Sequence, residues 1–324
     1  MLTLHSTLRV LRGIFTLTLA VLSGLSAVNG AANNLTQVPA SSFNPNPTNV
    51  GFYLYVPSNL QAKPPILVNP HACHGSAQDA FTGTQLATLA DTYGYIMIFP
   101  DSPNTADKCW DVSSNQTLTH DGGGDSQGIV SMVNYVLQNY SADPTRVFSM
   151  GTSSGAMMTN VLLGSYPDVF AAGSAWAGVA FGCFAGNGYD VWSDDCATGK
   201  IIKTGAQWEA IVKAAYPSYT GFRPKMQVFH GTIDTTLYPQ NLAEEIKEWT
   251  AVLGLPSSPI QTLSNNPDST WTTYIYGDTF HATNATGVTH NILTNESVVI
   301  DWFDLQCQGT GCYSRPASDR IFSA

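Results

Sequence analysis

Apolar and polar residues alternate near the start of the folded part of the chain, where Val50, Phe52, Leu54 and Val56 carry the apolar side chains. This period of two is typical of a strand with one buried face. Five shorter apolar runs follow without such alternation, and unbroken runs are typical of a parallel sheet that is covered on both faces. These runs are residues 66–68, 95–99, 147–150, 173–177 and 226–229.

Helical periodicity separates two of these runs, and we expect Asp125 or Ser126 to cap that helix. Alternating strands and helices predict one doubly wound, mostly parallel α/β sheet. Residues 271–276 are expected to form the final strand and residues 297–305 a closing helix. Residues 181–222 depart from the alternation, and we expect them to form a lid or a wall beside the sheet. The apolar positions of the predicted helix are Ile129, Val133, Val136, Leu137 and Tyr140.

The first thirty residues have the order of a secretory signal peptide. Arg9 and Arg12 precede the apolar run 13–25, and small residues follow it. The alternative is a membrane anchor, but the run is shorter than the ~20 residues that a spanning helix needs. We therefore expect residues 1–30 to be removed from a secreted protein and residues 31–324 to form a single domain.

Secretion changes the interpretation of the six cysteines, because thiols outside the cell oxidise to disulfides. Among the roughly fifteen possible pairings of six cysteines, loop spacing favours Cys307 with Cys312 and Cys183 with Cys196. Cys73 and Cys109 then remain as the third pair. The Asn-x-Ser/Thr sequences are glycan acceptors if they are exposed. They begin at Asn34, Asn115, Asn139, Asn284 and Asn295.

Composition restricts the class of protein and of partner. With 44% hydrophobic and 11% charged residues, the chain is neither a disordered tail nor a coiled coil. The net charge of -10 argues against nucleic acid as a partner, because phosphates require Lys and Arg. A neutral or weakly charged partner fits this composition better.

Residues 151–155 read Gly-Thr-Ser-Ser-Gly and match the pattern G-x-S-x-G. An expected strand at residues 147–150 precedes them, and an expected helix at residues 156–162 follows. In this context the pattern predicts a sharp turn that exposes Ser153 as a nucleophile. The alternative is an ordinary Gly-Ser turn.

A serine hydroxyl becomes a nucleophile when a histidine accepts its proton and an acid orients that histidine. In folds with this turn the chain order is serine, acid, histidine. Asp234 and His290 fit that order, because each lies in a Gly-containing turn after an expected strand. The alternative is that Asp234 caps the next helix and that His290 is an ordinary surface histidine. Other candidates are Asp278 as the acid and His230 and His281 as the base.

The oxyanion of such a reaction needs two N–H donors. We assign one to the amide of Ser154 and the second to the amide of Cys73, in the loop after the first buried strand. His71 and His74 lie in the same loop without a clear further ligand, so neither a metal nor another cofactor is expected. Residues 121–125 lack the lysine of a phosphate loop and are expected to form a tight turn.

Five segments carry a family resemblance: residues 109–114 (CWDVSS), 118–124 (LTHDGGG), 151–162 (GTSSGAMMTNVL), 166–170 (YPDVF) and 234–241 (DTTLYPQN). They closely resemble the fungal carbohydrate esterase family 1, which includes acetylxylan and feruloyl esterases and is related to polyhydroxybutyrate depolymerases. The resemblance implies a secreted α/β-hydrolase with a loop or lid insertion. It also implies metal-independent hydrolysis of plant cell-wall esters.

Matched motif by motif, the resemblance places the nucleophile on Ser153, the acid on Asp234, the base on His290 and the second oxyanion donor on Cys73. The implied activity is that of an acetylxylan esterase, with a feruloyl esterase as the alternative. An alternative of another class is a non-catalytic carbohydrate-binding homologue. Trp110 is expected to stack on a sugar ring of the substrate. The expected partner is xylan, with no nucleic acid or membrane partner, and the protein is expected to be a monomer.

Overall fold

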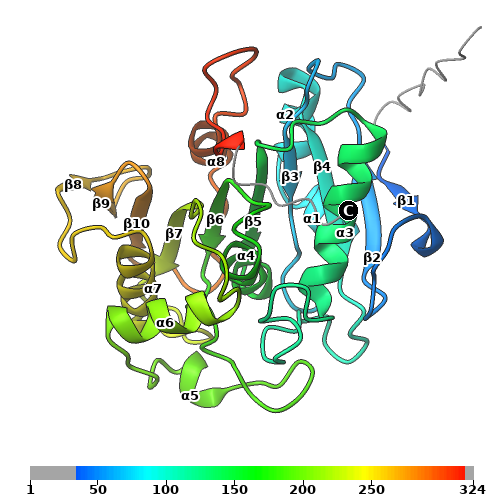
Figure 1. Ribbon diagram of the computed structural model, residues 1–324. Coiled ribbons are helices and arrows are strands. Elements are labelled where there is room, and N and C mark those ends of the chain that lie inside the picture. Colours follow the sequence, from blue (N-terminus) through cyan, green and yellow to red (C-terminus); the bar gives the residue numbers. More distant parts are fainter. Residues whose placement is uncertain (1–33, 318–324) are drawn as a thin grey trace, which may run out of the picture.

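The computed structural model describes residues 34–317, and its ten strands form one sheet (Figure 1). The expected signal peptide, residues 1–30, lies outside the described residues. The strand order across the sheet is β1-β2-β4-β3-β5-β6-β7-β10-β9-β8. The strands are β1 (Thr36–Val38), β2 (Gly51–Tyr55), β3 (Ile66–Val68), β4 (Ile96–Asp101), β5 (Val147–Thr152), β6 (Ala172–Trp176), β7 (Lys225–Gly231), β8 (Gln261–Ser264), β9 (Trp271–Gly277) and β10 (Phe280–Ala285).

The centre of the sheet is parallel and its two margins are antiparallel. Strands β4, β3, β5, β6, β7 and β10 run parallel, whereas β1 and β2 on one side and β9 and β8 on the other are antiparallel to their neighbours. Every residue of β3, β6 and β7 is buried, as expected for strands covered on both faces. The predicted mostly parallel α/β sheet is therefore confirmed.

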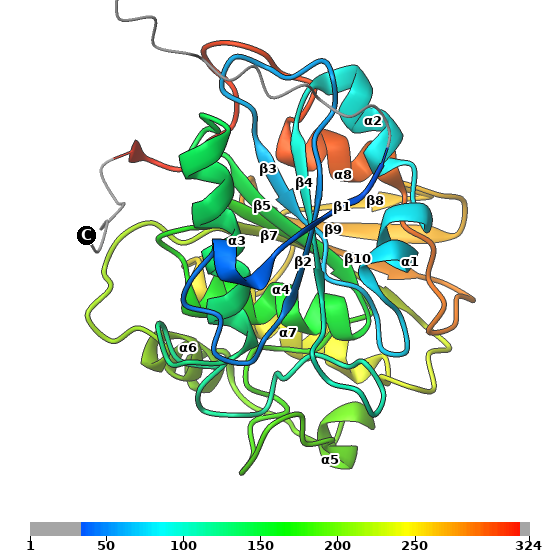
Figure 2. The same ribbon diagram turned by 90° about the vertical axis from the view of Figure 1, so that its right-hand side faces the viewer.

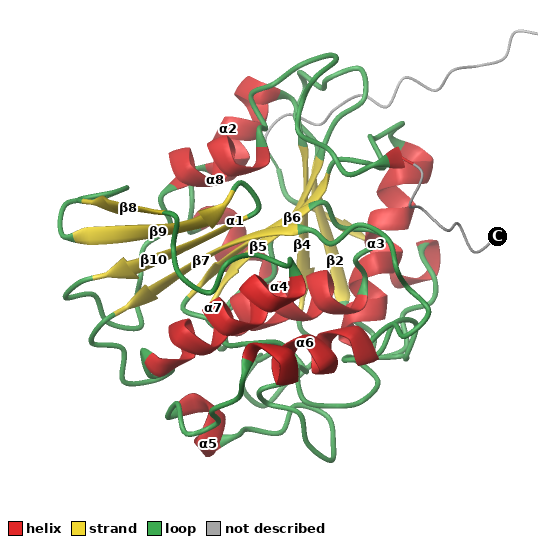
Figure 3. Ribbon diagram, turned by 60° about the vertical axis from the view of Figure 1, so that its left-hand side comes forward, coloured by secondary structure: helices red, strands yellow, loops and turns green. Residues whose placement is uncertain are grey.

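Helices cover both faces of the sheet (Figure 3). Helices α1, α2 and α8 lie on one face, and α3, α4 and α7 lie on the other (Figure 2), with α6 packed outside α7. Each face buries its own hydrophobic cluster, so the sheet is held between two apolar layers. The helices are α1 (Ala77–Thr82), α2 (Leu86–Tyr93), α3 (Asp125–Asn139), α4 (Ser154–Ser165), α5 (Asp194–Ala197), α6 (Gly205–Ala214), α7 (Gln240–Val252) and α8 (Glu296–Phe303), with a short 3-10 turn, η1 (Ala40–Ser42).

The expected cap of α3 is wrong. Gly124 is the N-cap residue and has no side chain that could cap the helix. Asp125 is already the first helical residue, and its carboxylate accepts a hydrogen bond from Asp111 N at 3.1 Å. Ser126 lies inside the helix. The glycine-rich segment before α3 forms the expected tight turn, and a side chain at Gly124 would collide with the backbone of Thr117.

Residues 271–276 form a strand as predicted, but this strand is not the last one. Strand β10 follows it and inserts between β7 and β9. Its sequence, Phe-His-Ala-Thr-Asn-Ala, contains too many small and polar residues to form an apolar run. Because β10 is parallel to β7, the loop that contains His290 begins at the edge of the sheet where β7 ends.

The segment at residues 181–222 contains α5 and α6. Helix α6 packs against α7, whereas Trp192, before α5, borders the cavity that Ser153 lines. The three disulfides join the expected pairs. No helix in the described part of the chain is long and apolar enough to span a membrane. Of the glycan acceptors, Asn34, Asn115 and Asn139 are exposed, and Asn284 and Asn295 are half-buried.

Candidate active site

The serine of the G-x-S-x-G pattern lies in a strained turn between β5 and α4. Ser153 has φ 56° and ψ -122°, a conformation that ordinary residues avoid. Its amide donates to Trp176 O at 2.8 Å, which fixes the turn to β6. A side chain at Gly155 would collide with the carbonyl oxygen of Pro70, and one at Gly151 would collide with the backbone of Gly155. Both glycines are therefore required by close packing.

Loops that follow β5, β7 and β10 bring three polar side chains together. His290 Nε2 lies 2.8 Å from Ser153 Oγ, and His290 Nδ1 lies 2.7 Å from Asp234 Oδ2. A carboxylate only accepts hydrogen bonds, so Nδ1 carries the proton and Nε2 is left to accept the serine hydroxyl. This arrangement can activate an alcohol for attack on a carbonyl carbon.

Asp234 is held as a carboxylate. Its Oδ1 accepts from Thr236 N at 2.8 Å and from Leu237 N at 3.0 Å. Burial by itself would raise the pKa of Asp234. Hydrogen bonds from His230 and His290, the charge that His290 can carry and the Thr236 amide outweigh burial and hold this pKa well below its usual range. Asp234 therefore stays ionised and orients His290.

The alternative acid and bases lie elsewhere. Asp278 is exposed in the turn between β9 and β10, and His281 packs on the ring of Trp302 at 4.9 Å between centroids. His230 is buried, and its Nε2 lies 2.7 Å from Leu237 O. Among the described residues, no hydrogen bond joins any of the three to Ser153. His230 contacts Asp234 instead, with its Nε2 at 3.3 Å from Asp234 Oδ2.

The amides expected to bind the oxyanion are both free. Ser154 is the first residue of α4, where backbone N–H groups have no partner within the helix, and Cys73 lines the same cavity as Ser153. Neither amide donates a hydrogen bond within residues 34–317. The disulfide to Cys109 ties the loop of Cys73 to its neighbour. Their role as oxyanion donors stays a prediction.

The expected sugar-stacking role of Trp110 is wrong, because its side chain lies in the core with 1% exposure. Its indole Nε1 donates to His71 O at 2.8 Å, and its backbone amide donates to Ser154 Oγ at 2.8 Å. Ser102 N also donates to His71 Nε2 at 3.0 Å. Trp110 therefore supports the loop that carries Cys73 and cannot reach the substrate.

A cavity of about 640 Å³ opens over Ser153 and His290. Its apolar walls were not predicted from the sequence, above all Trp192 at 51% exposure and Leu293 at 83% exposure. The available signals were an indole inside a disulfide loop and the aliphatic pair Ile292 and Leu293, which begins two residues after the catalytic histidine candidate. The other residues around this cavity are Ala72, Cys73, His74, Asp107, Cys109, Thr152, Met157, Thr236, Leu237, Asn291 and Ile292.

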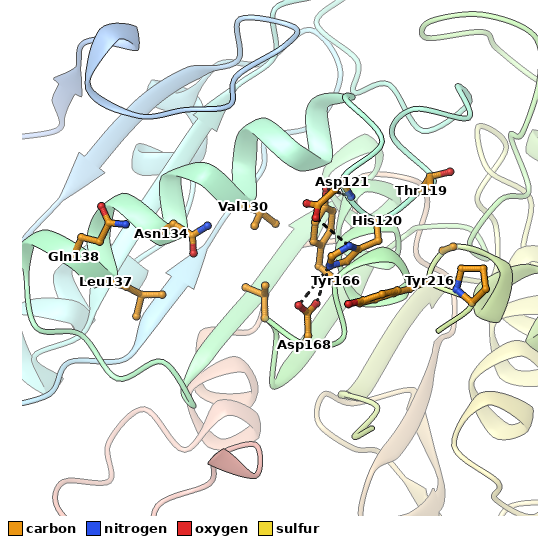
Figure 4. Close-up of a pocket in the computed structure, with 13 residues that line it drawn as sticks. Thr119, His120, Asp121, Val130, Asn134, Leu137, Gln138, Tyr166, Asp168 and Tyr216 are labelled. Carbon is orange, nitrogen blue, oxygen red and sulfur yellow. Dashed lines mark hydrogen bonds and ion pairs between the residues drawn. The ribbon is translucent and has the colours of Figure 1, made fainter. Parts of the chain in front are cut away.

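A second cavity, of about 480 Å³, lies between α3 and the loops that carry His120, Asp168 and Tyr216 (Figure 4). There His120 Nε2 is 3.3 Å from Asp168 Oδ1, and its Nδ1 is 3.3 Å from Asp121 Oδ2. Tyr216 stacks on the imidazole at 3.8 Å between centroids. The one hydroxyl of a Ser or Thr among the described residues that line this cavity is that of Thr119. Both ring nitrogens of His120 lie beside carboxylates and neither is hydrogen-bonded to that hydroxyl, so His120 does not activate it.

Comparisons with known proteins agree with this geometry. Residues 50–246 match the family described as esterase PHB depolymerase. The chain is 48% identical over 272 residues to acetylxylan esterase A of Emericella nidulans, covering 83% of this chain and 88% of that protein. It is 44% identical over 297 residues to acetylxylan esterase A of Aspergillus awamori, covering 90% of this chain and 97% of that protein.

Solved structures show the same relationship. Acetyl xylan esterase from Aspergillus awamori superposes with a TM-score of 0.82 at 44% identity, covering 84% of this chain and all of that one. The Staphylococcus aureus serine hydrolase FphF, at 15% identity and a TM-score of 0.51, covers 84% of this chain and 98% of its own, and shares the fold alone. The chain therefore belongs to the esterase PHB depolymerase family and is a carboxylic ester hydrolase with an α/β-hydrolase fold.

Proposed function

We propose that this chain is a secreted serine carboxylesterase that removes acetyl groups from xylan through an acyl-enzyme. One observation carries the proposal: an unbroken chain of hydrogen bonds runs from Ser153 Oγ through His290 to Asp234. The relatives with up to 48% identity are named acetylxylan esterases, which supports this substrate over other esters.

In the first step Ser153 Oγ attacks the acetyl carbonyl carbon while His290 Nε2 takes the hydroxyl proton. The C=O electron pair moves onto oxygen, and the amides of Ser154 and Cys73 stabilise that oxyanion. The C–O bond to the sugar then breaks as the pair returns. His290 gives its proton to the leaving sugar oxygen, which leaves an acetyl ester on Ser153.

In the second step a water molecule replaces the sugar. His290 takes a proton from the water as its oxygen bonds to the acyl carbon, and the same two amides again stabilise the oxyanion. The bond to Ser153 Oγ breaks, and His290 returns the proton to that oxygen. Acetic acid leaves and the enzyme is restored. Throughout, the Asp234 carboxylate stabilises the imidazolium form of His290.

The proposal includes the site of action. The composition of residues 1–30 favours a signal peptide, and three disulfides suit an oxidising compartment. We propose that residues 31–324 act outside the cell as a single catalytic domain and a monomer.

A feruloyl esterase is the second candidate, because one observation favours it. The cavity of about 640 Å³ is larger than an acetyl group requires, and the exposed side chains of Trp192 and Leu293 on its wall are apolar. Such a wall suits either the phenolic ring of a ferulate or the apolar face of a sugar ring.

A paired assay on the secreted protein separates the candidates. We expect release of acetate from acetylated xylan to exceed release of ferulate from methyl ferulate, and the reverse order would assign a feruloyl esterase. A fluorophosphonate probe is expected to label the wild type and not Ser153→Ala. A folded wild type that stays unlabelled would instead indicate a non-catalytic carbohydrate-binding homologue.

A further inference from the structure

Two histidines contact one oxygen of Asp234. His290 Nδ1 lies 2.7 Å from Asp234 Oδ2, and His230 Nε2 lies 3.3 Å from the same oxygen. His230 is the penultimate residue of β7, and its side chain is completely buried. Because Asp234 Oδ2 shares its negative charge between both contacts, the protonation state of His230 affects the hydrogen bond between Asp234 and His290.

The protonation of His230 is partly fixed by its neighbours. Its Nε2 lies 2.7 Å from Leu237 O, and a carbonyl only accepts, so Nε2 carries a hydrogen. The other nitrogen, Nδ1, is buried without a hydrogen-bond partner in the described part of the chain. His230 can therefore be neutral, or it can become an imidazolium by taking one proton on Nδ1.

A buried acid on α7 interacts electrostatically with this histidine. Helix α7 packs against β7, and the acid is Glu245. Glu245 Oε1 accepts from Asn160 Nδ2 at 2.9 Å, whereas its Oε2 has no hydrogen-bond partner among residues 34–317. The next acid on this face, Glu248, interacts with Glu245.

Burial and the neighbouring groups have opposite effects on the pKa values of His230 and Glu245. Burial lowers the pKa of His230, but the contacts with Asp234 and Leu237 O and the charge of Glu245 outweigh it and raise that pKa above its usual value. Burial raises the pKa of Glu245 to about 7, against the opposing effects of His230 and Asn160. Loss of the Glu245 charge would therefore disfavour the protonated form of His230.

We propose that His230 is a positioning residue of the triad: its protonation, which the charge of Glu245 favours, sets the basicity of His290 through Asp234. This inference rests on the proposed triad mechanism. A proton on His230 draws negative charge of Asp234 toward β7, so the carboxylate stabilises the imidazolium of His290 less. His290 then loses its proton at a lower pH, and the esterase stays active in more acidic solution.

Two conservative variants test the pair. Gln at 230 can still direct an amide N–H toward Leu237 O but takes up no proton, and Gln at 245 keeps the acceptor for Asn160 without the charge. In His230→Gln and in Glu245→Gln we expect the acidic midpoint of the pH profile of kcat/KM on 4-nitrophenyl acetate to rise by about 0.5 to 1 pH unit. The double variant should shift no further than His230→Gln alone.

Glu248→Gln is the matched control, because Glu248 is equally buried on the same helix and its pKa lies well above the usual range. It already holds its proton, so the acidic midpoint should not move. Unchanged midpoints in both test variants would overturn the proposal and leave His230 a structural residue, and additive shifts would overturn the claim that Glu245 acts through His230. If His230→Gln fails to fold, Glu245→Gln decides alone, and a wild type not labelled by fluorophosphonate would refute the esterase mechanism itself.

Discussion

The two cavities each contain a histidine bonded to an aspartate, yet only one arrangement fits catalysis. His290 has one nitrogen on Asp234 and the other on a serine hydroxyl. His120 has both nitrogens beside carboxylates, those of Asp121 and Asp168, and a tyrosine stacked on its ring. A histidine can act as a base only where one ring nitrogen is free to accept a proton from a nucleophile. A His–Asp contact alone therefore does not identify an active site.

Replacement of the nucleophile or the base should have the largest effect and is the most direct way to break this comparison. We expect Ser153→Ala and His290→Ala each to lower kcat by about 10⁴- to 10⁶-fold, because each removes a reacting group. In His120→Ala we expect kcat/KM on 4-nitrophenyl acetate to stay within about 3-fold of wild type. Its Tm should fall, because the stacked ring and both aspartate contacts are lost. An equal loss of activity in His120→Ala would show that the second cavity takes part in the reaction.

Asp234 and Asp168 should likewise differ in their effect on activity. We expect Asp234→Asn to lower kcat by about 10⁴-fold near neutral pH, because the new amide N–H favours the wrong tautomer of His290. Asp168→Asn should leave kcat nearly unchanged, since both ring nitrogens of His120 lie beside carboxylates. Steady-state kinetics on the same ester measure both variants. Comparable losses in the two would contradict the assignment of the acid to the loop after β7.

The sequence was informative where one local rule decides the structure. The apolar runs predicted the central strands within a few residues, because a strand covered on both faces admits few polar side chains. Strand β10 was missed because its alternating small and polar residues have no such signature. The cap at Asp125 was wrong because Asp125 is already the first helical residue, and its carboxylate is bonded to a distant loop.

In the candidate site, too, a local rule predicts some residues, and only the three-dimensional contacts identify the others. Ser153 was predictable from two glycines that the packing requires, and the order of acid and base follows from the strand order. Trp110 was misassigned because an indole next to a disulfide suits a sugar platform and a buried support equally well, and only the three-dimensional contacts distinguish them. His230 was considered as a base, but its contact with Asp234 depends on the path of the turn after β7, which the sequence pattern does not specify.

Two buried acids, Asp234 and Glu248, should differ in how the stability of the fold depends on pH. Asp234 has a lowered pKa, whereas burial and the neighbouring Glu245 raise that of Glu248 well above the usual value. Since the folded pKa of Glu248 exceeds its unfolded value, its contribution to stability is complete below the unfolded pKa and is lost as pH rises toward the folded pKa. Above about pH 5 we expect Glu248→Gln to gain up to about 1.4 kcal/mol per pH unit relative to wild type in the free energy of unfolding. Urea unfolding at pH 5, 6 and 7 measures this, and a difference independent of pH would show that Glu248 is ionised in the folded protein.

The smallest effect should distinguish two tryptophans near the active site. Trp192 is half exposed on the cavity wall and packs edge-on against Phe184 at 5.1 Å, whereas Trp110 is buried under the loop of Cys73. A partly exposed indole that stacks on a sugar ring contributes about 1 kcal/mol, so Trp192→Ala should lower kcat/KM on acetylated xylan by about 5-fold. The rate on 4-nitrophenyl acetate should change little, because that ester has no sugar. Trp110→Phe should instead reduce both rates alike, since the loss of the indole N–H disturbs the loop that carries an oxyanion donor. Equal losses on both substrates in Trp192→Ala would mean that this side chain shapes the cavity near Ser153 and does not bind the polymer.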